Sequence, residues 1–398
     1  LANRFLGLEP ILRQFQSIQL IYEQSFESNS FIDTVESHLS KILQRNWTSG
    51  KNQNRKCYVM MMERSTDALS LFARNESYSS ALFSSQKSML NNLNYEDGSN
   101  SSKKQVAKLD EDDQLWNKFR YQSLENAKIQ INSKLKGFVE SNRNSSNSSG
   151  KQNSENLTNF QFQDIIEDFT KHINKLKEIV TLQKEQKFEA SFDIEQGILT
   201  GQKANGDIFN FSSISRDDLP RQEDRIRLSI LAFISGISLE DVKKQFGLDD
   251  AEIRILNELI KKYSLTNIRP TTLLNRKRKS SKGENQYFVT RFSEILEAFI
   301  NCCFWTNDGF VKSFARRNIV MNMKNQDALD NYQFILNTLT TKSEEKPLIV
   351  FFVNGPISET DIRELSFLKE SVKDPHFDLM IGGTSVVYLD SEVFSMTQ

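Results

Sequence analysis

The segment Gly382-Gly383-Thr384-Ser385 carries residue types that could bind a phosphate group. Glycines allow backbone amides to approach an anion closely, and hydroxyl groups can donate further hydrogen bonds. A P-loop, however, requires a lysine directly after its last glycine, and a dinucleotide-binding turn requires three glycines before a helix. Here Thr384 follows Gly383, and strand-like residues 386–389 follow the segment. We therefore interpret it as a structural turn after a buried strand, with phosphate binding by a nucleotide-dependent enzyme as the alternative.

The rest of the sequence offers little for catalysis or metal binding. Its three cysteines and three histidines lack the paired spacing of a zinc site. The acidic run Leu109–Trp116 lacks the alternating ligands and turn glycine of a calcium loop. It fits a helix start better, because acidic residues are favourable at the positive end of a helix dipole. We predict no catalytic residue, no metal ion and no cofactor.

The composition favours a mainly helical protein of two or three domains. The chain has 398 residues but only 15 glycines and 6 prolines. Its net charge of -1 gives no reason to expect nucleic acid as a partner. Three cysteines that cannot form a disulfide framework indicate a reducing cytosol or nucleus, and no apolar run approaches the roughly 20 residues that span a bilayer. We expect a cytoplasmic protein. The sequence begins with Leu1, and residues 1–21 read as a helix, so we expect an N-terminally truncated chain.

Three short apolar runs predict strands that position the glycine segment. Cys57–Met62 and Leu348–Val353 are continuous apolar runs, typical of strands covered on both faces. Ser358 can then cap a helix, with Asp361 as its reciprocal partner. A further strand begins at Leu379–Ile381. Strand, helix and strand at this spacing form a βαβ unit, and Cys57–Met62 is expected to join the same parallel sheet.

This pattern predicts a parallel α/β sheet domain that is interrupted by a large helical insertion. Residues 1–85 would form the first part of the α/β domain and residues 345–398 the second part. Residues 86–344 would form the inserted helical domain.

Within the insertion, two long amphipathic segments predict an antiparallel helical hairpin at about residues 113–188. A polar, low-complexity stretch, Ser141–Asn156, separates them and predicts a flexible tip. The segments could pack only on each other, or their outer side could bind partner helices. The apolar positions recur every three or four residues: Leu124, Ala127, Ile131, Leu135 and Phe138, then Phe162, Ile166, Phe169, Ile173, Leu176 and Val180.

Four stretches of the sequence together resemble segments of one protein family, and they follow one another in that family's order. They read MMMERSTDALSLF, LDEDDQLWNKFRYQSLENAK, KPLIVFFVNGPISETDIREL and FDLMIGGTSVVYLDSEVF. Order and spacing are similar to those of the Sec/Munc (SM) proteins, which bind syntaxins and guide SNARE assembly. The resemblance implies the fold of SM domains 2 and 3. It also implies structural roles for Arg64, Asp67, Asp112, Trp116, Arg120, Gly382 and Gly383.

The resemblance further implies a non-enzymatic protein that binds SNAREs and templates their assembly in vesicle docking and membrane fusion. Its partners would be a syntaxin-type (Qa) SNARE, a vesicle (R) SNARE and the assembled SNARE bundle. The protein would associate peripherally with vesicle or target membranes through them. A helical scaffold of a tethering complex is the other alternative. The expected partner-binding residues lie in the distal hairpin: Lys134, Phe138, Asn142, Phe160, Phe162 and Asp164.

Overall fold

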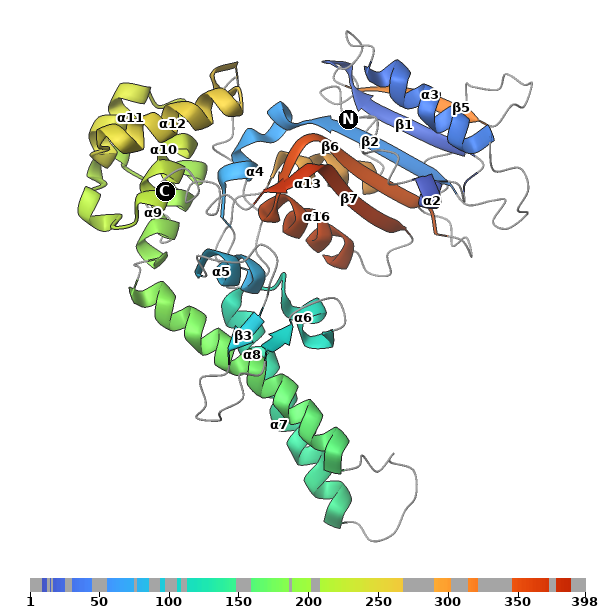
Figure 1. The fold of residues 1–398 in the computed structure, drawn as a ribbon, viewed down its shortest axis with the longest axis vertical. Helices are drawn as coiled ribbons and strands as arrows, with labels where there is room; N and C mark the ends of the chain where they lie inside the picture. The colour runs from blue at the N-terminus through green and yellow to red at the C-terminus, as the bar shows by residue number, and fades with distance from the viewer. Residues whose placement is uncertain are drawn as a thin grey trace. The chain divides into compact units, whose positions relative to one another are not determined.

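The computed structural model divides the chain into two compact units, residues 1–72 with 260–387, and residues 73–259 with 388–398. Figure 1 shows their helices and strands. The residues that the structure describes are 9–12, 15, 17–25, 31–44, 56–74, 77–85, 94–96, 106–108, 113–147, 159–185, 188–201, 208–267, 290–301, 314–320, 346–371 and 377–387.

The first unit is built on a five-stranded sheet in the order β5-β1-β2-β6-β7. Four strands run parallel, and β5 runs antiparallel beside β1. The predicted combination of a parallel α/β sheet with a large helical part is therefore confirmed. The strands are β1 (Ser17–Glu23), β2 (Cys57–Glu63), β5 (Phe314–Val320), β6 (Leu348–Ser358) and β7 (Asp378–Val387).

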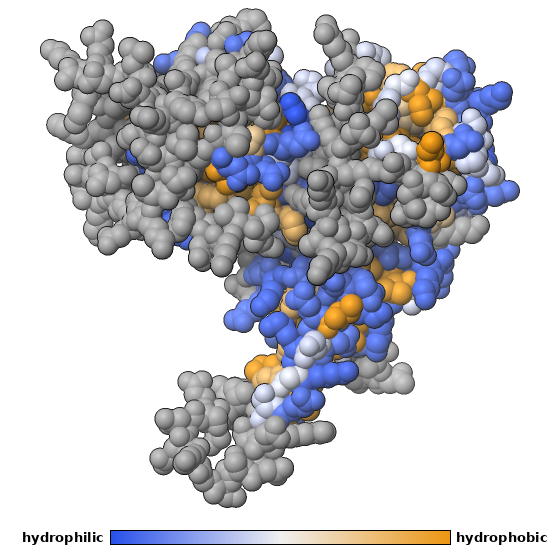
Figure 2. Space-filling view, turned by 180° about the vertical axis from the view of Figure 1, so that it is seen from behind, coloured by the Kyte–Doolittle hydropathy of each residue, from blue (hydrophilic) through white to orange (hydrophobic). Residues whose placement is uncertain are grey.

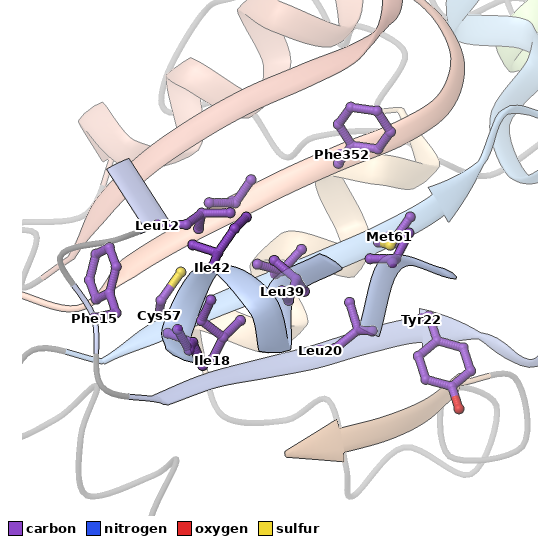
Figure 3. Close-up of a cluster of buried hydrophobic side chains, with 14 of the residues drawn as sticks. Leu12, Phe15, Ile18, Leu20, Tyr22, Leu39, Ile42, Cys57, Met61 and Phe352 are labelled. Carbon is purple, nitrogen blue, oxygen red and sulfur yellow. The ribbon is translucent and has the colours of Figure 1, made fainter. Parts of the chain in front are cut away.

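Helices cover both faces of this sheet. Helix α3 packs on one face, where alternate residues of β1, β2 and β6 form a buried cluster (Figure 3). Helices α13 and α16 pack on the other face against the residues in between. Strands buried on both faces must be apolar throughout, which explains the continuous runs in β2 and β6. The helices of this unit are α2 (Glu9–Leu12), α3 (Phe31–Gln44), η3 (Arg64–Asp67), α4 (Ala68–Phe72), η6 (Leu265–Asn267), α13 (Arg291–Ile300) and α16 (Glu359–Ser371).

The N-terminal part corrects one expectation, because residues 17–21 form a strand and not a helix. Ile18, Leu20 and Tyr22 face the α3 side of the sheet, whereas Ile21 faces the other side. This two-residue alternation suits a strand between two helical layers. Strand β5 also falls in the range assigned to the helical insertion. The expected domain boundaries at 85 and 345 remain predictions.

The start of α16 agrees with the expected cap. The Ser358 amide donates to Asp361 Oδ2 at 2.9 Å, and the Asp361 amide donates to Ser358 Oγ at 3.2 Å. This reciprocal pair satisfies two amides at the helix end. Leu365 and Leu368 are then buried in the core, and Ile362 packs against it.

The second unit is mainly helical and contains the long hairpin of α7 and α8 (Figure 1). Helix α7 includes Ser141–Asn147, so the first half of the expected flexible tip is helical; residues 148–158 lie outside the described residues. A short antiparallel pair, β3 and β4, precedes the hairpin. The elements are α5 (Tyr78–Ser85), β3 (Asn94–Glu96), β4 (Val106–Lys108), α6 (Gln114–Phe119), α7 (Leu124–Asn147), α8 (Asn159–Glu185), α9 (Phe188–Thr200), η4 (Phe211–Ser213), η5 (Arg216–Asp218), α10 (Gln222–Ile234), α11 (Leu239–Phe246) and α12 (Asp250–Lys262).

Candidate partner-binding site

The base of the hairpin is a closed four-helix core. Helices α5 and α6 pack against α7 and α8, so apolar side chains there are removed from water. Trp116 of α6 lies edge-on to Tyr78 of α5, with ring centroids 5.4 Å apart. The buried members are Tyr78, Ala81, Leu82, Trp116, Phe119, Ala127, Ile131, Phe169, Leu176 and Ile179.

A chain of polar contacts runs through this core. His172 of α8 is fully buried, and its Nε2 lies 3.0 Å from Oδ2 of Asp113. Its Nδ1 lies 3.1 Å from the hydroxyl of Tyr78. A carboxylate can only accept, so Nε2–H donates to Asp113, and in the neutral ring Nδ1 accepts from Tyr78. Three elements that are distant in sequence are thereby joined by satisfied buried groups.

Asp113 also caps α6, because its Oδ1 accepts from the Trp116 amide at 2.8 Å. Lys171 Nζ lies 2.9 Å from its Oδ2. Burial raises the pKa of the Asp113 carboxyl, but the hydrogen bonds from His172, Trp116 and Lys171 outweigh it and hold the pKa well below its usual range. Asp113 is therefore a charged anchor of the hairpin base.

The apolar side chains in the distal half of the hairpin are less buried than those at its base. Among the described side chains, no apolar residue of α7 beyond Ile131 is buried, and none of α8 before Phe169. Of the described helices, only α7 and α8 extend along this half, and a pair of helices cannot enclose the apolar sides of both. Figure 2 shows hydrophobic side chains among hydrophilic ones along this hairpin. The half-buried apolar residues are Leu135, Phe138, Val139, Ile165 and Ile166.

The expected partner-binding residues all lie on these two helices. Lys134 is exposed, and the positive charge of Lys118 lowers its pKa. Phe138 is half-buried, and its ring centroid lies 6.4 Å from that of Phe169. For Asn142, Phe160, Phe162 and Asp164 the structure describes the helical backbone but not the side chains. Their role in binding stays a prediction.

Arg64 and Asp67 form a buried polar network in the sheet-bearing unit. Arg64 lies 2.6 Å from Asp361 Oδ2, and its guanidinium also donates to Ser70 Oγ at 2.5 Å. Asp67 Oδ2 accepts from the amide of Arg291 at the start of α13. Both residues therefore tie the turn after β2 to the starts of neighbouring helices, in line with a structural role.

The resemblance also implies structural roles for three positions in or next to α6. Trp116 is in the core of the hairpin base, and the Arg120 guanidinium lies 4.8 Å from the centroid of the Tyr121 ring. Asp112 lies outside the described residues. The next residue, Asp113, was not among the predicted positions, although an aspartate three residues before Trp116 is a typical N-cap signal.

The glycine segment is not a turn. Strand β7 continues through Gly382–Ser385 and pairs with β6 along its length. Strand β6 has a bulge between Val353 and Pro356, and the neighbouring strand β7 must follow it. A Cβ on Gly383 would lie 2.8 Å from the Gly355 carbonyl oxygen. The glycine is therefore needed for close strand packing, and an extended strand does not form a phosphate cradle.

Other kinds of site find no support in the part of the chain that the structure describes. There, no group of three His, Cys, Asp or Glu side chains could hold a metal ion. No helix among the described residues is long and apolar enough to cross a membrane.

A model of the Sec1 family matches residues 10–391, which is nearly the whole chain. The chain therefore belongs to the Sec1 family, and the resemblance to Sec/Munc proteins is confirmed. No curated protein sequence matches the chain significantly.

Solved structures of the same class share the fold. The Unc18–syntaxin 1 complex from Monosiga brevicollis superposes with a TM-score of 0.74 at 14% identity, covering 99% of this chain and 71% of that chain. The SM protein Vps45 gives 0.57 at 13%, covering 99% and 65%. Sly1p in complex with an N-terminal peptide of Sed5p gives 0.62 at 11%, covering 100% and 66%. The chain thus spans about two thirds of the length of these relatives.

Proposed function

We propose that this protein is a non-enzymatic SNARE-binding protein whose helical hairpin binds SNARE helices and aligns them for assembly in membrane fusion. Membership of the Sec1 family supports the proposal. Structures of similar proteins were solved in complex with syntaxin 1, with the Qa SNARE Tlg2 and with an N-terminal peptide of Sed5p. We infer a syntaxin-type SNARE as the first partner, with a vesicle SNARE and the assembled bundle as further ones. The arrangement would correspond to SM domains 2 and 3.

This proposal depends on one observation, the incomplete burial of apolar side chains in the distal half of the hairpin. Val139 of α7 and Ile166 of α8 are half-exposed at positions that a third helix could cover. An amphipathic helix that packs there would remove their apolar surface from water, at about 25 cal/mol for each Å² buried. The closed base would meanwhile hold α7 and α8 in place.

Alignment of SNARE helices follows from the same geometry. Free helices that assemble must lose translational and rotational freedom together, which makes their association slow. A hairpin fixed at its base would hold one helix in register for the next. Membrane association of the protein would then be peripheral and would depend on its membrane-anchored partners.

The test compares two exchanges on the hairpin with a matched control. V139D and I166D place a charge on the half-exposed apolar side, whereas I129D places the same charge at a position that is 55% exposed. Ile129 lies between the buried residues Ala127 and Ile131 and therefore points away from the core. Binding of a purified Qa SNARE cytoplasmic segment would be measured by calorimetry.

We expect V139D and I166D to weaken binding by at least about tenfold, since each removes an apolar contact and buries a charge. I129D should bind normally, and circular dichroism should show unchanged helix content in all three. Deletion of residues 142–156 should weaken binding as well. Unchanged affinity of V139D, I166D and the deletion variant would refute the hairpin as the binding surface.

A further inference from the structure

Two stripes of side chains, one on each helix of the hairpin, form a surface that we call the lysine face. In each stripe the residues follow one another at steps of four, three and four, so they share one side of their helix. The stripes are Lys128, Asn132, Leu135 and Val139 on α7, and Ile166, Thr170, Ile173 and Lys177 on α8. Their apolar members are half-buried, whereas the two basal lysines, Lys128 and Lys177, are exposed.

Helix α6 lies on the opposite side of α8 from this face. The carboxylate of Asp113, which caps α6, is 2.9 Å from Lys171 Nζ. Lys171 and Ile173 are two residues apart, which is about 200° around a helix of 3.6 residues per turn. The stripe that contains Ile173 is therefore on the side of α8 that points away from α6.

Helix α7 is oriented in the same way. The side chains of Lys118 on α6 and Lys134 on α7 are neighbours. Val139 is five residues beyond Lys134, which is about 140° around the helix, and it therefore points away from α6 as well. Both stripes thus belong to one face of the hairpin.

The lysine face changes in character between the tip and the base of the hairpin. The rings of Phe138 and Phe169, with centroids 6.4 Å apart, show which parts of the two helices are level. Val139 and Ile166 lie within three residues of this ring pair, whereas the basal lysines lie ten and eight residues closer to the base. At 1.5 Å per residue, apolar and positive ends of the stripes are about 12–15 Å apart.

Acidic side chains offset little of this charge. Lys136 and Lys184 are also exposed, at the outer edges of the two stripes. Glu125 is 3.9 Å from Lys128, but both side chains are largely in water, where such a pair contributes little. Glu140 follows Lys136 by one turn and points further from α8. The positive charge is therefore available to a partner.

We propose that the lysine face selects an amphipathic helix that carries acidic side chains about 8–10 residues away from its apolar anchor residues. The inference rests on the proposed function and specifies the charge pattern of the partner. The apolar anchors would cover Val139 and Ile166, and the acidic side chains would meet the basal lysines. This arrangement fixes the direction of the partner along the hairpin, because the reverse direction places acidic groups on apolar surface.

A membrane surface fits this face less well than a helix does. Helices that bind to lipid expose large apolar side chains, which enter the boundary of the acyl chains. Here the apolar side chains of both stripes are half-buried, so a flat lipid surface reaches little of them. A single helix that lies along both stripes can contact them from α7 and α8 together.

Two synthetic helical peptides with the same apolar residues test the charge preference on the full chain. One peptide carries glutamates at the positions that would meet the basal lysines, and the other carries lysines there. Fluorescence anisotropy would measure both affinities. We expect the acidic peptide to bind about tenfold more tightly, since each exposed ion pair changes affinity about two- to fivefold. The preference should shrink at about 1 M salt, where the screening length is about 3 Å.

The K128E/K177E variant should reverse this preference. K244E is the matched control, because it reverses the charge of an exposed lysine on α11, outside the hairpin, and it should keep the wild-type preference. Circular dichroism should show unchanged helix content in both variants. Equal affinities of the two peptides for the wild type, or a preference that K128E/K177E leaves unchanged, would overturn the inference.

The Qa SNARE segment separates this inference from the proposed function. If V139D and I166D weaken its binding but K128E/K177E does not, only the charge selection is refuted. If none of these variants weakens its binding, the proposed function fails as well. Vesicles of phosphatidylserine and phosphatidylcholine test the membrane alternative. Sedimentation of the wild type but not of K128E/K177E with these vesicles, together with equal affinities for the two peptides, would assign the lysines to lipid and overturn the inference.

Discussion

His172 Nε2 and Asp113 Oδ2 lie 3.0 Å apart, although 59 residues separate them in the sequence. The contact joins the middle of α8 to the residue that caps α6. The packing of α8 against the start of α6 therefore depends on one buried, charge-assisted hydrogen bond as well as on apolar contacts. A surface for partner helices needs such a rigid base, because movement at the base is amplified at the tip.

We expect D113A to destabilise the second unit by about 3 kcal/mol, since it removes a helix cap and leaves His172 without its acceptor. Urea unfolding followed by circular dichroism would measure the loss. S238A removes the exposed cap of α11 and should cost only about 1 kcal/mol. Similar losses in the two variants would show that the His172 contact adds nothing.

The same carboxylate predicts an acid dependence of stability. The pKa of Asp113 is lower in the folded protein than the ordinary 3.8, so its stabilising effect is complete above that value and is lost as the pH falls below it. The difference in unfolding free energy between wild type and D113N should therefore be largest near neutral pH and shrink towards about pH 3. A difference that stays constant over this range would contradict the charged state of Asp113.

G383A should destabilise the sheet, whereas G382A should be tolerated. A Cβ on Gly383 would lie 2.7 Å from Ile357 Cγ2, but the nearest atom for Gly382 is Phe352 Cδ2 at an ordinary 3.6 Å. We expect a loss of about 2 kcal/mol for G383A and below about 1 kcal/mol for G382A. Thermal unfolding of the two variants would check this. Equal losses of stability in the two variants would show that the β6 bulge does not explain the need for glycine at position 383.

R64K should cost about 3 kcal/mol, because the single ammonium nitrogen of lysine cannot stand both where Nη1 bonds Asp361 and where Nη2 bonds Ser70 and the Asp67 carbonyl. It would also weaken the cation–π contact of Arg64 with the Phe292 ring, whose centroid is 4.6 Å away. As a control, R363K alters an arginine on α16 that lies 3.3 Å from the carboxylate of its neighbour Glu364. Denaturant unfolding should place R363K within about 0.5 kcal/mol of the wild type.

Several elements could be predicted from the sequence because their signals are local. Strand β2, strand β6 and the cap of α16 carry their pattern within about ten residues. Strand β1 was misread because its apolar residues follow a helix-like segment and were taken as its continuation. The pairing of β5 with β1 gives no local signal, since its partner lies almost 300 residues earlier.

The sequence by itself determined the parallel sheet, the amphipathic hairpin helices and the family. The spacing of apolar residues along the chain is enough to indicate buried strands and amphipathic helices. Only the tertiary structure decided which polar groups meet. Asp113 with His172, Arg64 with Asp361, and Gly383 with Gly355 depend on strand register and helix packing between distant segments. It also showed that Gly382–Ser385 continues a strand, because the need for glycine came from the neighbouring strand and not from a turn.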